Sequence, residues 1–488
     1  YSSDWSSDVC SSDLIPIWCG VPDIFNGKDQ HLFPPQGIMY LSAYIKAHSN
    51  HEVKILDANC DLLTQAQIEQ RIREYDPQVV GITTMTHNLI DVHECVKSAK
   101  RVNKDIHVIL GGPHAMRFPE EAISLSGVDS ICNERDAEEA FAEWIDYLDG
   151  KGEAKNVKGI WFKNADGSVT RNEACPINKD LSRFPMPDRE SINLDEYYTP
   201  GMLGLRSTTI VTSRGCPQGC KFCLSTAAFA SRTVKDIVDE MEVCKDMGIE
   251  EVLFVDDIFN APTKRVIEIS QEILRRKLKM YWAFKGTIAG TTYEMLKIAR
   301  EAGCLRGHFG VESGTPEGLQ ALGKTFMKPE KARQVFKWCK ELDMCGCAYI
   351  MIGTPAEKNR DDIMRTVDFV YQLDPEYVVY AITSPYPDTP LWQRGADLHL
   401  WDPDIWKRFM LNPTIENAEQ IPTMWNQYMS REELLSIFKE INRDFYFDPL
   451  KIYHTLKKMT NWEGVKRIAQ GGLAIAKLQL IKAQSRRI

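Results

Sequence analysis

The chain has 488 residues, of which 43% are hydrophobic and 26% are charged, and its formal net charge is −9. This length predicts two or three domains with separate cores. The acidic balance argues against a nucleic-acid partner, and we find neither a membrane-spanning apolar run nor a secretory signal. We therefore expect a cytoplasmic protein whose cysteines are reduced.

The first fourteen residues differ from the rest of the chain. Residues 1–14 repeat Ser-Ser-Asp three times and have neither helical nor strand periodicity. They resemble translated sequencing-adapter read-through, so we interpret them as a non-native artefact and leave them out of the fold prediction. The alternative is a genuine polar tail.

Residues 15–150 alternate short apolar runs with amphipathic stretches. Continuous apolar runs are typical of parallel strands that are buried on both faces. The alternation predicts an α/β domain with a doubly wound parallel sheet of the Rossmann type, whose ligands bind at the carboxyl ends of the strands. The expected strands are residues 52–58, 79–85, 107–112 and 129–133.

Three further regions follow. Residues 151–203 read as a linker that contains a hairpin around Asp166-Gly167. Residues 204–400 hold six β/α units, which predict a partial (β/α)6 barrel of the TIM type. Residues 401–488 read as a helical C-terminal region. From residue 451 onward this region has nine Lys or Arg and one acid. That basic tail is either a solvated helical face or a peripheral contact with an anionic membrane surface or an acidic partner.

Three cysteines stand within eight residues directly after the first expected barrel strand. Cys216, Cys220 and Cys223 lie in "CPQGCKFC". Thiolates bind soft metals and iron–sulfur clusters. A structural zinc site needs four ligands, and only Cys345 or Cys347 offers a fourth thiol at a distance along the chain. Unligated core cysteines are the remaining alternative. An iron–sulfur cube held by three thiolates leaves one iron open for another ligand.

This motif resembles the signature of the radical S-adenosylmethionine (SAM) enzymes, including the aromatic Phe222. The resemblance implies a [4Fe-4S] cluster on the three cysteines and SAM on the open iron. It also implies an oxygen-sensitive enzyme that takes electrons from a flavodoxin or ferredoxin. One electron cleaves SAM and yields a 5′-deoxyadenosyl radical, which abstracts hydrogen from an unactivated carbon.

The resemblance extends along the expected barrel strands. It implies that Asp256 and Asp257 accept hydrogen bonds from the SAM amino group, and that Glu312 faces the SAM ribose. The aspartates are alternatively an N-terminal cap of the following helix. Ile352 lies in a segment similar to the one that packs along adenine, and Ser384 lies in a segment similar to the sixth-strand turn.

One barrel position departs from the family pattern. Lys285 stands where relatives often have an arginine, and a lysine cannot form the same bidentate contact. The role of Lys285 therefore stays open.

Residues 15–150 resemble the cobalamin-binding domain that precedes many radical SAM barrels. The resemblance implies that cobalamin lies between this domain and the barrel. Thr83, Thr84, Gly111 and Gly112 stand at predicted strand ends, where small and hydroxyl side chains let a ligand approach.

The cobalamin resemblance has two departures. Asn59 stands where cobalamin-ligating mutases have a histidine, so we expect no lower axial ligand there. The usual glycine-rich loop after the fourth strand keeps Glu134 and Glu138 but not its glycines. His114 lies in a suitable loop, where a histidine is either a cofactor contact or a loop hydrogen-bonder.

These features predict a cobalamin-dependent radical SAM enzyme that acts on a small molecule. The resemblance is to the group that contains the anaerobic magnesium-protoporphyrin IX monomethyl ester oxidative cyclases and the radical methyltransferases. Its members transfer a methyl group or oxidise the substrate further. The alternatives are a cobalamin-free radical SAM oxidoreductase and a non-catalytic iron–sulfur or cobalamin sensor. The substrate is not predicted, because selective residues lie on variable loops.

Overall fold

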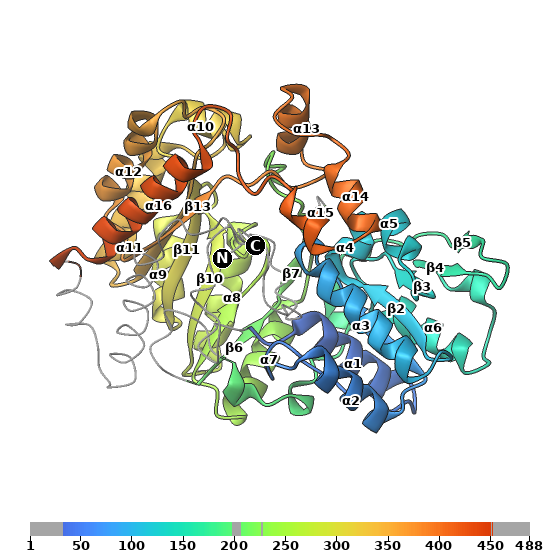
Figure 1. The fold of residues 1–488 in the computed structure, drawn as a ribbon. Coiled ribbons are helices and arrows are strands. Elements are labelled where there is room, and N and C mark those ends of the chain that lie inside the picture. The colour runs from blue at the N-terminus through green and yellow to red at the C-terminus, as the bar shows by residue number, and fades with distance from the viewer. Residues whose placement is uncertain (1–32, 198–205, 226–227, 450, 452–488) are drawn as a thin grey trace.

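The computed structural model describes residues 33–197, 206–225, 228–449 and 451 (Figure 1). The predicted artefact at residues 1–14 and the basic tail after Lys451 lie outside the described residues. Among the helices of the described part, none has the length and apolar character that crossing a membrane requires.

The N-terminal region contains a five-stranded sheet in the order β1-β2-β3-β4-β5. The first three strands are parallel, and the last two form an antiparallel hairpin that pairs with β3. The predicted hairpin around Asp166-Gly167 is therefore present, and it extends this sheet. The strands are β1 (Val79–Thr83), β2 (His107–Gly111), β3 (Ser130–Cys132), β4 (Ile160–Lys163) and β5 (Val169–Arg171).

Helices cover both faces of this sheet, as the doubly wound prediction requires (Figure 1). Alternate residues of β2 point to opposite faces. Val108 and Leu110 pack in the core with α2 and α3, whereas Ile109 packs with Trp144 of α6. The helices are α1 (Gln36–His48), α2 (Gln65–Tyr75), α3 (Leu89–Val102), α4 (Gly112–Arg117), α5 (Pro119–Ser124) and α6 (Glu138–Leu148).

The strand predicted at residues 52–58 is wrong. These residues form neither a strand nor a helix, and the sheet begins at β1, which pairs with β2. Leu56 and Ala58 still pack against the core under α2 and α3. The apolar pattern therefore identified side chains that contact the core, but such contact does not require that the backbone joins a hydrogen-bonded ladder.

The second unit is a six-stranded sheet of parallel strands in the order β13-β12-β11-β10-β9-β6. Its helices lie on the outer side (Figure 1). This is the partial (β/α)6 barrel that the sequence predicts. The strands are β6 (Ser207–Ile210), β9 (Glu251–Phe254), β10 (Tyr281–Thr287), β11 (Cys304–Glu312), β12 (Cys345–Ile352) and β13 (Tyr377–Ile382). The helices are α7 (Val234–Asp246), α8 (Thr263–Arg275), α9 (Tyr293–Glu301), α10 (Pro316–Ala321), α11 (Pro329–Glu341) and α12 (Arg360–Leu373).

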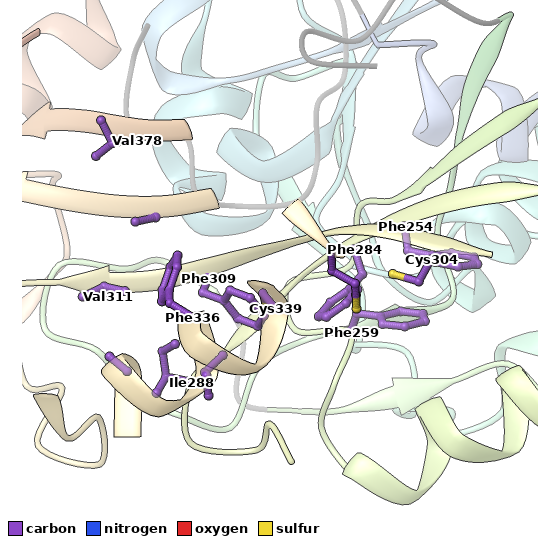
Figure 2. Close-up of a cluster of buried hydrophobic side chains, with 14 of the residues drawn as sticks. Phe254, Phe259, Phe284, Ile288, Cys304, Phe309, Val311, Phe336, Cys339 and Val378 are labelled. Atoms are coloured by element: carbon purple, nitrogen blue, oxygen red, sulfur yellow. The ribbon is translucent and has the colours of Figure 1, made fainter. Parts of the chain in front are cut away.

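The main core lies between the barrel strands and their helices. Phe254, Phe284 and Phe309 point from three neighbouring strands into one aromatic cluster (Figure 2). Phe259 stacks on Phe254 at 4.5 Å between ring centroids. Because strand residues alternate between faces, the residues between these aromatics face the inside of the half-barrel.

The C-terminal region is helical, as predicted. Helix α16 packs Leu434, Ile437 and Ile441 against the main core. The shorter helices before it carry a tryptophan cluster, in which Trp392 stacks on Trp401 at 5.0 Å. The helices are α13 (Pro390–Asp397), α14 (Ile405–Leu411), α15 (Ile415–Glu419) and α16 (Arg431–Tyr446).

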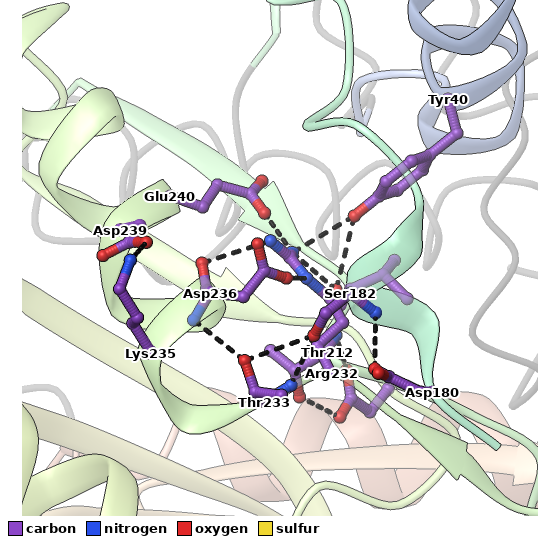
Figure 3. A network of polar contacts seen from close by, with 12 residues as sticks. Tyr40, Asp180, Ser182, Thr212, Arg232, Thr233, Lys235, Asp236, Asp239 and Glu240 are labelled. Atoms are coloured by element: carbon purple, nitrogen blue, oxygen red, sulfur yellow. Dashed lines mark hydrogen bonds and ion pairs between the residues drawn. The ribbon is translucent and has the colours of Figure 1, made fainter.

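A buried charge network joins the linker, α1 and α7. The carboxylate of Glu240, fully buried on α7, forms ion pairs with the guanidinium groups of Arg189 (2.6 Å) and Arg232. Arg232 also pairs with Asp236 and donates to the Tyr40 hydroxyl (Figure 3). Desolvating these charges is tolerable only while each keeps its partners.

We expect Glu240→Gln to destabilise the fold by about 3 to 5 kcal/mol, because it leaves two guanidinium groups buried against a neutral amide. The unfolding midpoint in urea, followed by circular dichroism, measures this loss. Lys235→Gln, which removes an exposed ion pair of the same helix, is the matched control and should change stability by less than about 1 kcal/mol. Equal effects of the two substitutions would contradict the buried network's role.

A second buried acid lies in the loop after β12. Glu357 is 3% exposed and accepts hydrogen bonds from the backbone N–H of Thr354 (2.8 Å) and from the hydroxyl of Thr366 (3.4 Å). Burial raises the pKa of this carboxyl from 4.5 to about 7. Because the folded pKa exceeds the unfolded one, the folded state binds more protons between these values, and stability falls as pH rises through that window.

We expect Glu357→Gln to match the wild type in stability near pH 4.5 and to exceed it by up to about 3 kcal/mol at pH 8. The amide keeps an oxygen for Thr354 and loses the buried charge. Melting temperatures of both proteins across this pH range test the expectation. A difference that does not change with pH would contradict it.

Candidate active site

The three cysteines lie on a long loop between β6 and α7. Two short strands, β7 (Ser213–Arg214) and β8 (Ala230–Ser231), pair with each other and close the base of this loop. The carboxylate of Asp256 accepts hydrogen bonds from the N–H of Thr212 and the hydroxyl of Ser213, both at 2.6 Å. Asp257 accepts one from the N–H of Gly215 at 2.8 Å. The aspartates after β9 therefore hold the start of the cysteine loop.

All three cysteine side chains are partly buried thiols. Burial raises the pKa of each to about 11. Within the part of the chain that the structure describes, no three His, Cys, Asp or Glu side chains converge as one metal ion requires. An iron–sulfur cube needs a different arrangement, because each thiolate bonds a different iron. Three soft donors on one short loop fit such a cluster.

An apolar wall surrounds this loop. Phe222 is 7% exposed and packs in a cluster with Leu322, Met351 and Trp392, against which Cys220 and Cys223 also pack. The same cluster contains Leu89 and Ile90 of α3 and Phe118, which come from the N-terminal unit. The cysteines therefore lie where the N-terminal unit, the barrel and the C-terminal tryptophans meet.

Backbone hydrogen bonds fix the middle of the cysteine loop. The N–H of Lys221 donates to the carbonyl of Leu322 at 3.0 Å, and the N–H of Leu391 donates to the carbonyl of Lys221 at 2.9 Å. These bonds connect the loop to the segment after α10 and to the start of α13.

Glu312, at the end of β11, has an unusual backbone. Its φ is +66°, and the pairing of β11 with β12 is irregular between Gly310 and Glu312. Bulges of this kind redirect side chains near active sites. The carboxylate is 2% exposed and pairs through Oε1 with the ammonium of Lys324 at 2.7 Å. Its other oxygen, Oε2, is buried and has no hydrogen-bond partner among the residues that the structure describes. An unpaired buried carboxylate oxygen fits a ligand that donates hydroxyl groups, such as a ribose.

The other residues predicted to bind SAM have different surroundings. Both oxygens of Asp256 accept hydrogen bonds from protein groups. The side chain of Ile352 is buried in the main core. The hydroxyl of Ser384 donates to the carbonyls of Ile382 (3.2 Å) and Thr423 (2.9 Å). Asp257 lies close enough to Cys216 and Cys223 to oppose their ionisation. Among the polar residues predicted to bind SAM, Asp257 and Glu312 are therefore the ones that the structure places near the cysteines.

The residues predicted to contact cobalamin lie at the carboxyl ends of β1 and β2. The hydroxyl of Thr84 donates to the carbonyl of Gly111 at 2.6 Å, which joins the two strand ends. Gly112 has a φ of +86°, and a Cβ there would lie 2.6 Å from the Thr83 hydroxyl. Gly111 has an extended backbone, and a Cβ there would meet no atom of the described residues within 4 Å. Within the described part of the chain, open space therefore borders Gly111, as an approaching ligand requires.

The same unit contains buried polar atoms that have no hydrogen-bond partner among the described residues. They include Nδ2 of Asn59, Nε2 of His114 in α4, and Oδ1 of Asn133, which follows β3. Burial lowers the pKa of His114 to about 3, so its imidazole is neutral. Such atoms are costly unless a ligand or water pairs with them, and this donor and acceptor set fits the amide-rich periphery of a corrinoid. The sequence did not single out Asn133, because asparagine is common in loops.

Arg214 connects this unit to the cysteine loop, and the sequence analysis missed it. Its guanidinium pairs with Asp136 (2.9 Å) and Glu138 (2.5 Å), and it lies 5.4 Å from the Tyr40 ring centroid. Arg214 precedes Cys216 by two residues, and Glu138 begins α6. The retained glutamate of the loop after β3 therefore pairs with the barrel.

Comparison with known proteins agrees with this geometry. Residues 23–144 match the model of the B12 binding domain, and residues 210–370 match that of the radical SAM superfamily. An uncharacterized methyltransferase of Pyrococcus horikoshii is 29% identical over 423 residues, which are 85% of this chain and 88% of the relative. The anaerobic magnesium-protoporphyrin IX monomethyl ester cyclase of Rubrivivax gelatinosus is 25% identical, with 75% of this chain and 67% of the relative covered.

A solved structure shares the fold. The radical SAM methyltransferase TsrM of Kitasatospora setae, solved with cobalamin and a [4Fe-4S] cluster, superposes with a TM-score of 0.70 at 16% identity. The match covers 92% of this chain and 97% of TsrM. The two domain matches imply a [4Fe-4S] cluster, SAM and cobalamin as cofactors. The chain is therefore an enzyme of the radical SAM superfamily that carries a B12-binding domain before its radical SAM domain.

Proposed function

We propose that this protein is a cobalamin-dependent radical SAM methyltransferase that acts on an unactivated carbon of a small molecule. One observation carries the proposal: the apolar cluster around Phe222 joins Cys220 and Cys223 to Leu89 and Phe118 of the B12-binding unit. A cluster at this junction would lie beside a cofactor held at the carboxyl ends of β1 and β2. Radical formation and methyl delivery would then share one compartment.

Each cofactor would have its own set of residues. Cys216, Cys220 and Cys223 would hold the [4Fe-4S] cluster, and Glu312 and Asp257 would contact SAM. The loops with Gly111, Asn59, His114 and Asn133 would face the corrinoid. Together the bound groups supply an electron, a 5′-deoxyadenosyl radical and a transferable methyl group.

The protein's own residues orient these groups and exclude water. The tryptophan cluster and Phe222 form an apolar wall beside the cysteines, which would shield a reactive radical from solvent. The partly buried ion pairs of Arg214 would hold the two domains in a fixed relative position. The Oε2 atom of Glu312, which is buried, would accept a hydrogen bond from a ribose hydroxyl.

Chain coverage favours methyl transfer over oxidative cyclisation. The alignment covers 88% of the Pyrococcus methyltransferase but 67% of the Rubrivivax cyclase, so the cyclase contains a further third that this alignment does not reach. A flavodoxin or ferredoxin would reach the cluster from the exposed side of the loop, at Pro217, Gly219 and Lys221.

We expect the anaerobically reconstituted protein to form 5′-deoxyadenosine from SAM and a reductant, and Cys220→Ala to abolish this reaction because the cluster loses a ligand. Iron content, visible absorption and chromatography of the products measure the effect. Cys345→Ala removes a thiol outside the loop and should leave cleavage within about twofold of the wild type. A wild type without SAM cleavage would favour a sensor and contradict the proposal.

We expect Gly111→Leu to reduce corrinoid uptake at least tenfold, because the side chain would fill the open space at the end of β2. Bound corrinoid per chain, measured by absorbance after gel filtration, tests this. Ser126→Leu places the same side chain in the exposed turn before β3 and should not affect uptake. A wild type that binds no corrinoid would instead favour the cobalamin-free oxidoreductase.

A further inference from the structure

Lys324 is a buried cation that no sequence motif indicated. It lies in the turn after α10 and is 6% exposed. Two backbone bonds hold the turn: its own N–H donates to the carbonyl of Leu319 (2.8 Å), and the N–H of Met327 donates to its carbonyl (3.0 Å). Burying an ammonium costs several kcal/mol unless it is paired, so its partners identify its role.

The partner of Lys324 is Glu312, and the surrounding backbone is shaped to allow the pair. The ammonium lies 2.7 Å from Oε1 of Glu312. A Cβ on Gly310 would lie 2.6 Å from both that oxygen and Nζ of Lys324. The neighbouring turn is also close to the cysteine loop, because a Cβ on Gly323 would lie 2.8 Å from Cγ of Lys221.

The turn that carries Lys324 also contacts the cysteine loop. The carbonyl of Leu322, two residues before Lys324, accepts the N–H of Lys221 at 3.0 Å, and Leu322 belongs to the apolar cluster against which Cys220 and Cys223 pack. The buried ion pair of Lys324 and Glu312 therefore stands beside the loop that carries the thiols. Charges buried at such a place contribute to the electrostatic potential of the loop, because little water screens them.

We propose that Lys324 is a positioning residue with two effects on the cluster site. It holds the Glu312 carboxylate by one oxygen so that Oε2 faces SAM, and it places a positive charge that favours the reduced cluster. The inference rests on the proposed function, since it assumes that the cysteines hold a [4Fe-4S] cluster and that SAM binds beside them. It adds a residue that sets both the affinity for SAM and the reduction potential.

The test measures two quantities on the reconstituted protein: the dissociation constant of SAM by equilibrium dialysis, and the midpoint potential of the cluster by redox titration with electron paramagnetic resonance. Lys324→Met should weaken SAM binding at least tenfold, because the Glu312 carboxylate loses the charged hydrogen bond that positions it. It should also shift the midpoint potential of the cluster to more negative values, because it removes a positive charge. Glu312→Gln should also weaken SAM binding but should shift the potential to more positive values, because it removes a negative charge.

The double variant Lys324→Met/Glu312→Gln separates electrostatics from structural damage. Its two charge changes cancel, so its potential should return toward the wild-type value while its SAM affinity stays low. Lys324→Arg should keep the potential and restore only part of the affinity, since it keeps the charge but changes the geometry. Lys328→Met, at an exposed lysine four residues away, should change neither quantity.

Three results would overturn the inference. The first is a midpoint potential that shifts in the same direction in both single variants, as general damage would cause. The second is wild-type SAM affinity in Lys324→Met. The third is a pair of variants, Lys324→Met and Lys324→Arg, that both fold but take up no cluster, since the lysine would then serve cluster assembly. A wild type that holds no cluster or binds no SAM would instead refute the proposed function itself.

Discussion

The partly buried ion pairs of Arg214 are the constraint on which the candidate site depends. A guanidinium group that has lost most of its contact with water needs its partners, and here they are Asp136 and Glu138 of the B12-binding unit. Because Arg214 precedes Cys216 by two residues, the same pairs fix the start of the cysteine loop against that unit. The position of the thiols therefore depends on how the two domains pack against each other.

The loop is held at its other contacts by backbone groups and apolar packing. Asp256 and Asp257, after β9, accept hydrogen bonds from the start of the loop. The backbone of Lys221 bonds to Leu322 and Leu391, and Phe222 packs in the cluster that contains the tryptophans. The position of the thiols is therefore set by the backbone and apolar contacts of the loop, and not by contacts of the sulfur atoms. A loop organised in this way can receive a cluster without rebuilding its surroundings, which is the condition for precise cofactor placement.

Some of the unpaired buried atoms of the described residues belong to the candidate site. They include Oε2 of Glu312 in the barrel and side-chain atoms of Asn59, His114 and Asn133 in the B12-binding unit. A fold selected for stability alone would pair or expose such groups, since each costs about 1 to 3 kcal/mol. Glu312 ends β11, His114 lies in the helix that follows β2, and Asn133 follows β3, which agrees with the general location of ligands in parallel α/β folds.

The sequence by itself determined the fold class and the cysteine motif. Both depend on local pattern: alternating apolar runs specify buried parallel strands, and a spacing of eight residues keeps three thiols together in any fold. The pattern failed at residues 52–58, where Leu56 and Ala58 pack against the core without strand pairing, because an apolar pattern reports side-chain contacts and not backbone hydrogen-bond partners.

Only the tertiary structure decided which polar residues meet. Arg214 with Glu138, and Lys324 with Glu312, are pairs made by chain crossings and by a bulge in β11. The structure also separated Asp256, whose oxygens hold the loop, from Asp257, which lies beside the thiols. Side chains next to each other in sequence can serve different partners, and long-range packing sets those partners.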